Sequence, residues 1–284
     1  MFVHLNGDLV PDAEAAIPVS DRGFRYGDAG FETLRAYGGE LFRWDAHESR
    51  LRGTLDALGM PDALPGDLRD RVRETLDAND LADAYVRVSV TRGPQAGKLA
   101  PGPAEHPTVV VVTKPLPRGG RESDSVWDAP ARVETVPTRR VPDSAIPADA
   151  KTHNYLNGVL AKRDLSPDAD AALMLDVDGN VAECATSNVF FARDGVLHTP
   201  TTDGDVLPGI TRDTVLDLAA DRGIPVETGR YGPEALRDAD ELFLTNTTWE
   251  LRPVSALDGR GYPVGDLAET LADAYDDHVE TAHY

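Results

Sequence analysis

The stretch from residue 183 to residue 212 decides the fold, and it contains the motifs ECATSNVF (183–190), LHT (197–199) and LPGITR (207–212). Glu183 stands just before an apolar run typical of a strand. We therefore expect its carboxylate to be partly buried and to need a cationic partner. The last motif ends a loop and opens a helix. A glycine in front of the exposed N–H groups of a helix start is suited to binding a phosphate.

A carboxylate and a phosphate site on one segment indicate a cofactor with a cationic ring and a phosphate arm. Pyridoxal phosphate is such a molecule, because its ring nitrogen pairs with a carboxylate and its aldehyde reacts with a lysine. The chain offers four lysines for this reaction. Lys151 begins the run KTHNY, Lys162 lies in a charged helical pattern, Lys98 lies in a glycine-rich loop that could reach a ligand, and Lys114 precedes a Pro/Gly-rich segment.

The spacing of these motifs resembles that of the class IV (fold type IV) pyridoxal-phosphate aminotransferases. This family includes branched-chain amino-acid aminotransferases, D-amino-acid aminotransferases and 4-amino-4-deoxychorismate lyases. The resemblance extends from YGD at 26–28 to RPV at 252–254, which is nearly the whole chain. It implies a mixed α/β (α+β) enzyme of two domains, with the cofactor in the cleft between them.

The domain boundaries follow from composition. Residues 115–125 (PLPRGGRESDS) have two Pro, two Gly and alternating charge but no apolar face, which is typical of a linker. We therefore expect an N-terminal α/β domain at 1–114 and a strand-rich, pyridoxal-phosphate-binding C-terminal domain at 126–284.

The resemblance assigns the chemistry to particular residues. Lys151 takes the position of the lysine that holds the cofactor covalently and serves as catalytic base and acid. Tyr155 matches a tyrosine that donates to the ring oxygen of the cofactor, although a helix core would also suit it. Glu183 matches the carboxylate that keeps the pyridine nitrogen protonated. Arg140 resembles an arginine near the cofactor, with its neighbour Arg139 as the alternative.

Four further residues match phosphate ligands of the family. Arg50 matches a helical arginine, for which a surface pair with Glu48 is the alternative. Ile210 and Thr211 would supply backbone N–H groups at a helix start. Thr247 matches another phosphate ligand, although threonines after a strand often form only a cap or turn.

The substrate leaves more alternatives open. Tyr85 and Arg87 resemble a pair that branched-chain enzymes use around the substrate carboxylate, and Thr248 is a further substrate-binding candidate. The alternative is that Tyr85 and Arg87 are ordinary sheet residues, one on each face. The loop that starts at Thr91 resembles that of D-amino-acid enzymes, but Gly97 and Leu99 stand where those enzymes have an arginine and a histidine.

The run FETLR at 31–35 resembles some of the lyases, and Glu32 stands near the position of their threonine proton donor. We expect an aminotransferase that acts on an amino acid, of branched-chain L type or glutamate, and on a 2-oxo acid. The alternative is the lyase, which eliminates pyruvate to leave 4-aminobenzoate. A D-amino-acid aminotransferase ranks third.

Charge excludes other classes of protein. Asp and Glu number 49 against 28 Lys and Arg, so the formal net charge is -21. Such a surface repels phosphate backbones and anionic membranes, and we expect neither nucleic acid nor membrane as a partner. No secretory signal is recognisable, and Cys184 is the single cysteine, which together favour the cytoplasm. No metal-ligand spacing is present.

Two expectations concern assembly and environment. The family resemblance implies a homodimer. Scarce lysine and abundant Asp and Glu resemble the composition of proteins from salt-accumulating microbes, in which concentrated salt screens the self-repulsion.

Hydrophobic periodicity predicts the elements. We expect helices at 45–59 with Asp45 as N-cap, at 66–79, after Asn154 with an apolar side, at 211–222 and at 266–282. Strands are expected at 2–5, 9–10, 31–37, 41–44, 85–91, 108–113, 132–137, 171–177, 188–192, 196–199 and 241–245.

Overall fold

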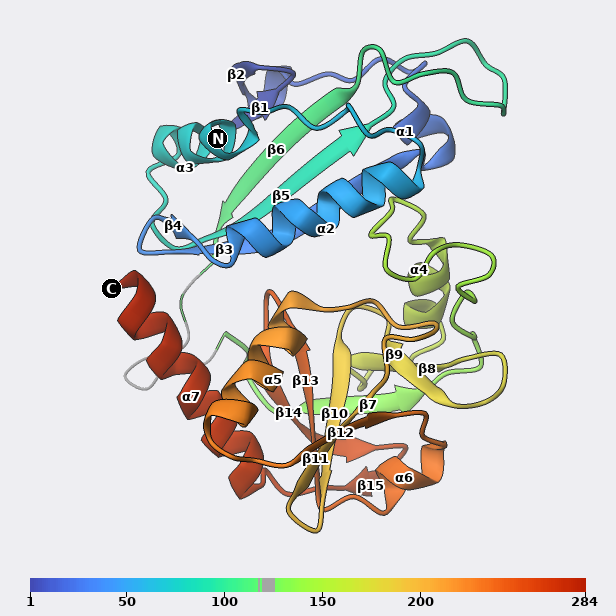
Figure 1. Cartoon of the computed structure of the whole chain (residues 1–284), viewed down its shortest axis with the longest axis vertical. Coiled ribbons are helices and arrows are strands. Elements are labelled where there is room, and N and C mark those ends of the chain that lie inside the picture. Colours follow the sequence, from blue (N-terminus) through green and yellow to red (C-terminus); the bar gives the residue numbers. More distant parts are fainter. Residues whose placement is uncertain (117, 119–125) are drawn as a thin grey trace. The chain divides into compact units, whose positions relative to one another are not determined.

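The computed structural model describes residues 1–116, 118 and 126–284 and divides the chain into two compact units (Figure 1). The first unit comprises Met1–Pro117, Ala150–Asn154 and His283–Tyr284, and the second comprises Arg118–Asp149 and Tyr155–Ala282. Most of the expected linker, at 117 and 119–125, lies outside the described residues. The domain boundaries at 114 and 126 stay a prediction, as does the position of the cofactor in a cleft.

The first unit is built on an antiparallel six-stranded sheet with the order β2-β1-β6-β5-β3-β4. The expected hairpin at the N-terminus is confirmed, with Val3 paired to Val10. The second expected hairpin is shorter than predicted, because a helix begins at Trp44, where a strand was expected. The strands are β1 (Phe2–Leu5), β2 (Asp8–Pro11), β3 (Ala29–Tyr37), β4 (Glu40–Leu41), β5 (Ala84–Thr91) and β6 (Thr108–Pro115).

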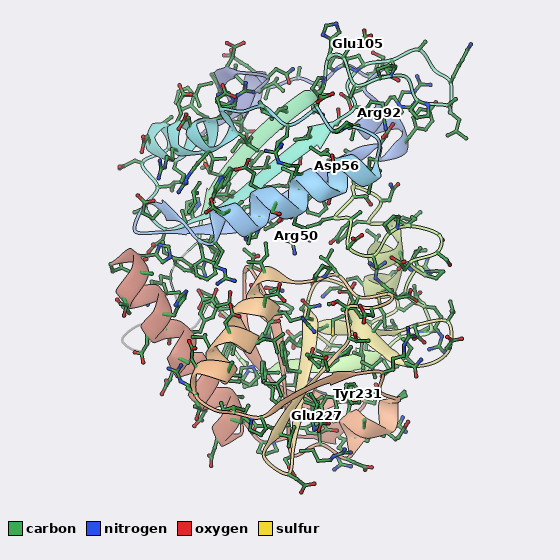
Figure 2. The ribbon with its side chains drawn as sticks, in the orientation of Figure 1. Arg50, Asp56, Arg92, Glu105, Glu227 and Tyr231 are labelled. Carbon is green, nitrogen blue, oxygen red and sulfur yellow. The ribbon has the colours of Figure 1, made fainter. Side chains whose placement is uncertain are left out.

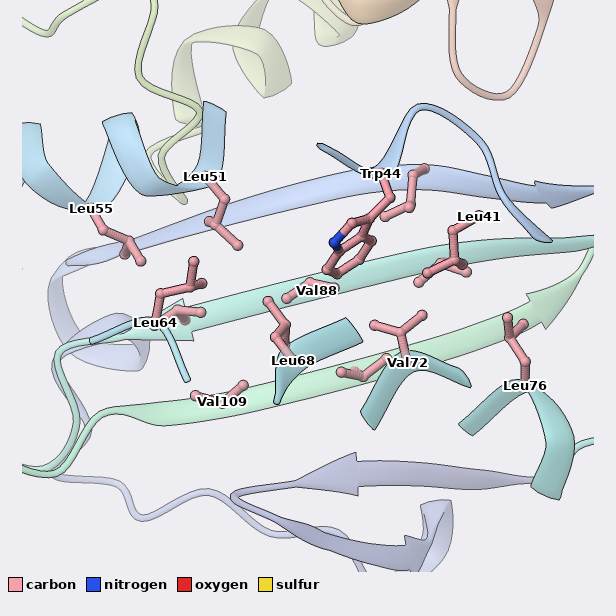
Figure 3. Packing of buried hydrophobic residues seen from close by; sticks show 14 of the residues in the cluster. Leu41, Trp44, Leu51, Leu55, Leu64, Leu68, Val72, Leu76, Val88 and Val109 are labelled. Carbon is pink, nitrogen blue, oxygen red and sulfur yellow. The ribbon is translucent and has the colours of Figure 1, made fainter. Parts of the chain in front are cut away.

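Two amphipathic helices, α2 (Trp44–Ala57) and α3 (Leu68–Ala78), cover one face of this sheet (Figures 1 and 3). Leu51 of α2 and Val72 of α3 pack with Val88 of β5 in a single apolar core, and this burial is the main stabilising term of the unit. Asp45 is not the N-cap of α2. That position is held by Arg43, in a left-handed conformation and without a side-chain cap. Two short helices, η1 (Asp12–Glu14) and α1 (Arg22–Tyr26), precede β3.

Residues Ala150–Asn154 extend this sheet along the edge of β3. The backbone N–H of Phe31 donates to the carbonyl of Lys151, and the N–H of His153 donates to the carbonyl of Ala29, each over 2.9 Å. The Lys151 N–H donates to Thr54 Oγ1 of α2 over 2.9 Å. The backbone of Lys151 is therefore fixed on both sides, against a strand and against a helix.

The second unit contains a nine-stranded mixed sheet with the order β12-β11-β10-β13-β14-β7-β8-β9, and β15 pairs with β14. Among the described strands, the parallel pairs are β11–β12, β14–β7 and β7–β8. The strands are β7 (Ala131–Thr135), β8 (Ala171–Leu175), β9 (Val181–Cys184), β10 (Asn188–Arg193), β11 (Val196–Pro200), β12 (Val226–Gly229), β13 (Glu241–Asn246), β14 (Glu250–Leu257) and β15 (Arg260–Gly261).

The helices of the second unit are α4 (Leu156–Arg163), α5 (Ile210–Asp221), α6 (Pro233–Arg237) and α7 (Asp266–His283), whose last residue belongs to the first unit. The expected α5 and α7 are confirmed to within a residue. The expectation for α4 is half right. The helix exists, but its apolar side is not a core face, because Leu156 is 67% and Val159 60% exposed and only Ala161 is buried.

The predicted mixed α/β class with strand-rich sheets is confirmed. Within the described ranges no helix has the length and apolar character to cross a membrane.

Candidate active site

Lys151 and Arg87 meet on the aromatic ring of Phe31, on the face of the first sheet opposite to α2 and α3. The Lys151 ammonium lies 4.7 Å from the ring centroid, and the Arg87 guanidinium carbon lies 3.8 Å from it. The register explains the meeting, because Phe31 of β3 pairs with Ser89 of β5, and Arg87 lies two residues away on the same face. The aromatic face offers both cations a favourable contact.

His153 completes this group of side chains. Its ring packs edge-on against Phe31 with centroids 5.5 Å apart, and its Nε2 lies 3.2 Å from Ser89 Oγ. Burial and the nearby positive charge of Arg87 lower the pKa of His153 to about 4. A neutral imidazole next to two cations adds no further charge to them near neutral pH.

Tyr85 and Arg87 lie on the same face of β5, because residues two apart in a strand share a face. The alternative of one residue on each face is thus wrong. The opposite face of β5 carries Val86 and Val88, which are buried in the core. Both substrate-binding candidates of this strand therefore share a sheet face with Lys151.

Arg50 projects from α2 (Figure 2) and is bound by Glu32 of β3. Its Nε donates to Glu32 Oε1 and its Nη2 to Glu32 Oε2, each over 2.7 Å. His47 Nδ1 lies 2.7 Å from the same Oε2. The expected alternative, a surface pair of Arg50 with Glu48, is not what the structure shows, since Glu48 pairs with Arg52 over 2.8 Å.

The partners of Glu32 decide its protonation. Burial raises the pKa of this carboxyl, but the charge and hydrogen bonds of Arg50 and His47 outweigh that effect and lower the pKa to about 2. Burial also lowers the pKa of His47. Glu32 is thus ionised at neutral pH and both of its oxygens accept hydrogen bonds, so it is unsuited to the proton-donor role considered for the lyase.

Glu183 is the central carboxylate of the second unit. It lies within β9 and not just before a strand, and its side chain is 11% exposed. Oε1 accepts a 2.8 Å hydrogen bond from Arg140 Nε, which provides the expected cationic partner. Arg140, not Arg139, fills this role. The segment is fixed by α4, because the amide of Asn157 bonds the backbone of residues 139 and 141.

Asn188 connects Glu183 to the loop before α5. Its Nδ2 donates to the carbonyl of Leu207 over 3.0 Å and lies 3.5 Å from Glu183 Oε2, and the Leu207 N–H donates to that same oxygen over 3.2 Å. At Gly209, an added Cβ would lie 2.0 Å from Asn188 Oδ1, so no other residue fits there without displacing Asn188. The carboxylate and the helix start are thus parts of one packed arrangement.

The start of α5 has the features expected of a phosphate site. Gly209 is its N-cap and contributes no side-chain hydrogen bond, while Ile210 and Thr211 are buried in the first turn. The N–H groups of a first turn have no partner within the helix and carry partial positive charge. The expected helix start is confirmed; the role of Ile210 and Thr211 as phosphate ligands stays a prediction.

The remaining candidates lie elsewhere in the second unit. Tyr155 is the N-cap residue of α4 and is 36% exposed, so it is not a core residue. Thr247 and Thr248 form the turn between β13 and β14, which Asn246 stabilises by accepting from the Thr248 N–H over 2.9 Å. β13 pairs with β10, where Asn188 lies opposite Thr245. The strand that leads to this turn therefore runs beside Asn188.

Sequence reasoning missed the supporting residues Phe31, Glu32, His47, His153 and Asn188 as parts of the site. A signal existed for two of them, since His47 and Arg50 are one helical turn apart and Asn188 lies inside the quoted motif. Among the residues described, no group of three or more His, Cys, Asp or Glu could hold a metal ion.

Comparison with known proteins identifies the family. The model of amino-transferase class IV matches residues 29–257. A putative branched-chain-amino-acid aminotransferase of Methanocaldococcus jannaschii is 37% identical over 98% of this chain and 96% of its own. The D-alanine aminotransferase of Listeria monocytogenes is 31% identical (91% and 88% covered), and the aminodeoxychorismate lyase of Bacillus subtilis is 30% identical (92% and 88% covered).

Solved structures agree with this result. The branched-chain aminotransferase of Thermoproteus uzoniensis with norvaline superposes with a TM-score of 0.88 at 32% identity, over 98% of this chain and 94% of that one. A second branched-chain amino acid aminotransferase, from T.th. and solved with pyridoxamine 5'-phosphate, gives 0.90 at 32% identity, over 100% and 95%.

The chain belongs to the class IV aminotransferase family. Enzymes of this class use pyridoxal phosphate. The protein is accordingly a pyridoxal-phosphate-dependent aminotransferase, as the sequence predicts.

Proposed function

We propose that this aminotransferase moves the amino group between a branched-chain L-amino acid, or glutamate, and a 2-oxo acid. The observation that carries the proposal is the 37% identity, over 98% of the chain, to a putative branched-chain-amino-acid aminotransferase. The D-alanine enzyme and the lyase are less similar, at 31% and 30%. The shared sheet face of Tyr85, Arg87 and Lys151 adds support, because a cationic, aromatic surface suits a substrate with a carboxylate.

The donor set fits pyridoxal phosphate. Lys151 would hold the cofactor covalently, and Glu183, a buried carboxylate with a cationic neighbour, would pair with its ring nitrogen. The N–H groups of Ile210 and Thr211, the side chain of Arg50 and the hydroxyl of Thr247 would hold the phosphate, and Tyr155 would donate to the ring oxygen. When bound, the cofactor supplies an electron sink for the bonds at the substrate alpha carbon.

The side chains of this chain perform the rest of the work. Lys151, once the substrate amine has replaced it, moves a proton to and from the substrate alpha carbon as base and acid. Glu183 keeps a proton on the ring nitrogen, and Arg140 holds the Glu183 carboxylate in its ionised form. Tyr85, Arg87 and Thr248 orient the substrate.

A half-reaction assay tests the substrate. The purified enzyme is mixed with single amino acids and the visible absorbance of the bound cofactor is followed. We expect L-leucine, L-valine, L-isoleucine or L-glutamate to change the spectrum and D-alanine to leave it unchanged. A response to D-amino acids alone would overturn the substrate class. So would a spectrum that no amino acid changes together with pyruvate release from aminodeoxychorismate.

The homodimer is part of the same proposal. Phe24 and Leu99 are 76% and 77% exposed. They lie on adjoining segments, because Arg22 donates to the carbonyls of Lys98 and Leu99 over 2.7 and 2.9 Å. Exposed apolar side chains on neighbouring segments are typical of an interface. Sedimentation equilibrium should give twice the chain mass.

We also propose a cytoplasmic enzyme adapted to high salt, with the excess of acidic over basic residues as support. The free energy of unfolding should rise as KCl is increased from low to molar concentration, because salt screens the repulsion among acidic side chains. A free energy independent of salt would contradict this adaptation.

A further inference from the structure

Arg50 is held in a way that phosphate binding alone does not require. Glu32 grips one edge of the guanidinium, with both carboxylate oxygens 2.7 Å from the nitrogens Nε and Nη2. The side chains of Glu32 and Arg50 are only 2% and 11% exposed. Two parallel, charge-assisted hydrogen bonds fix the plane of a guanidinium and its rotation within that plane.

His47 fixes Glu32 in turn. Its Nδ1 lies 2.7 Å from Glu32 Oε2, and its side chain is 3% exposed. His47 and Arg50 are three residues apart and so lie on one face of α2, toward β3. Glu32 sits on the face of β3 that α2 covers, as Leu34 does two residues on. One strand position and one helical turn thus bring the three side chains together.

The neighbouring ion pair on α2 shows the contrast. Arg52 and Glu48 are four residues apart on the helix and form a single 2.8 Å contact, with side chains 51% and 34% exposed. Such a surface pair adds little stability and leaves the arginine mobile. A buried pair costs desolvation, and apolar residues of similar volume often stabilise a core as well or better. What the buried pair adds is a fixed direction for the guanidinium.

We propose that Glu32 is a positioning residue for the cofactor phosphate: it holds the Nε–Nη2 edge of Arg50, directs the edge with Nη1 toward the phosphate, and is itself held by His47. This inference rests on the proposed phosphate role of Arg50. It gives Glu32 a function in cofactor binding without contact between Glu32 and the cofactor.

The test compares two ligands that differ only in the phosphate. Full-length protein freed of cofactor is titrated with pyridoxal phosphate and with pyridoxal, and the dissociation constants are compared for wild type, Glu32→Gln and the matched control Glu48→Gln. An amide presents an N–H₂ donor to a guanidinium that has only donors, so one hydrogen bond is lost. We expect Glu32→Gln to weaken pyridoxal phosphate binding on the order of tenfold and to leave pyridoxal binding unchanged.

The other results have equally definite meanings. An equal loss for both ligands would show a merely structural role and overturn the proposal, and so would unchanged or tighter binding of pyridoxal phosphate. Glu48→Gln should change neither constant. Where Glu32→Gln does not fold, Glu32→Asp keeps the charge but withdraws the carboxylate by one methylene, and it should show a smaller loss for pyridoxal phosphate alone.

Arg50→Ala separates this inference from the role on which it rests. If Arg50→Ala weakens pyridoxal phosphate but not pyridoxal while both Glu32 variants bind normally, only the positioning role fails. If Arg50→Ala binds both ligands as wild type does, the phosphate role of Arg50 fails first, and the positioning role fails with it.

Discussion

The two units hold their candidate cofactor residues by different means. In the second unit, Glu183, Asn188 and the loop before α5 lie within about thirty residues of chain and are joined by backbone and amide hydrogen bonds. In the first unit, Arg50 and Lys151 depend on partners far away in sequence. Arg50 is held by Glu32, and Lys151 is fixed through Phe31 and Thr54. A local motif builds one set and sheet register builds the other.

Lys151→Ala should have the largest effect, because it removes the amine that binds the cofactor and moves the proton. We expect turnover to fall by at least about 10³-fold. The measurement is the steady-state rate with the donor identified above. Lys114→Ala, at the exposed end of β6, is the control and should retain wild-type turnover. Undiminished turnover of Lys151→Ala would leave the first unit without its catalytic residue and would break the comparison.

Glu183→Gln tests the second unit at its carboxylate. A neutral amide cannot hold a proton on the ring nitrogen, so we expect turnover to fall on the order of 10²-fold, with a smaller change in the dissociation constant of pyridoxal phosphate. Glu227→Gln, an exposed carboxylate of β12 (Figure 2), is the matched control. Unchanged kinetics for Glu183→Gln would rule out the assigned role.

This difference between the units also explains what the sequence could predict. The helix start at Ile210 and the buried carboxylate of Glu183 follow from contiguous motifs, because a carboxylate, a glycine and a helix start have local meaning. The apolar face of α4 was predicted as core and is exposed. Periodicity shows that a helix has an apolar side but does not show what covers it.

The network around Arg50 could not be predicted from the sequence. Glu32 and Arg50 are 18 residues apart and lie on a strand and a helix. Their pairing depends on which face of β3 is turned to α2, and a shift of one residue would have placed Thr33 there instead. The same holds for Phe31, which meets Lys151 only because residues 150–154 add to the edge of β3.

Gly209→Ala tests whether the motif of the second unit acts as one packed arrangement. The added Cβ would lie 2.0 Å from Asn188 Oδ1, so Asn188 must move, and it bonds the Leu207 carbonyl. We expect the affinity for pyridoxal phosphate to fall about tenfold, since the first N–H groups of α5 lose their alignment. Gly53→Ala in α2, where a Cβ meets nothing within 4 Å, should bind normally. Normal binding by Gly209→Ala would show that the loop adapts.

His153 provides the smallest effect, and it tests the first unit alone. The pKa of His153 is lowered from 6.5 to about 4 by burial and by Arg87. Between these two pH values the unfolded chain binds a proton that the folded chain does not. The stability contribution is therefore complete above pH 6.5 and is lost as the pH falls toward 4. Since the side chain is partly exposed, we expect a loss on the order of 1–2 kcal/mol.

The measurement is the free energy of unfolding by urea across pH 7 to 4.5, at high salt to screen the other charges. This range stays above the window of Glu32, whose pKa is lowered from 4.5 to about 2 and whose contribution is lost only below that range. His153→Asn should flatten the slope, whereas the exposed His106→Asn should not. Equal slopes for wild type and His153→Asn would mean that His153 titrates alike in the folded and unfolded chains. The cationic surface of Lys151 and Arg87 on Phe31 would then not exclude a third charge.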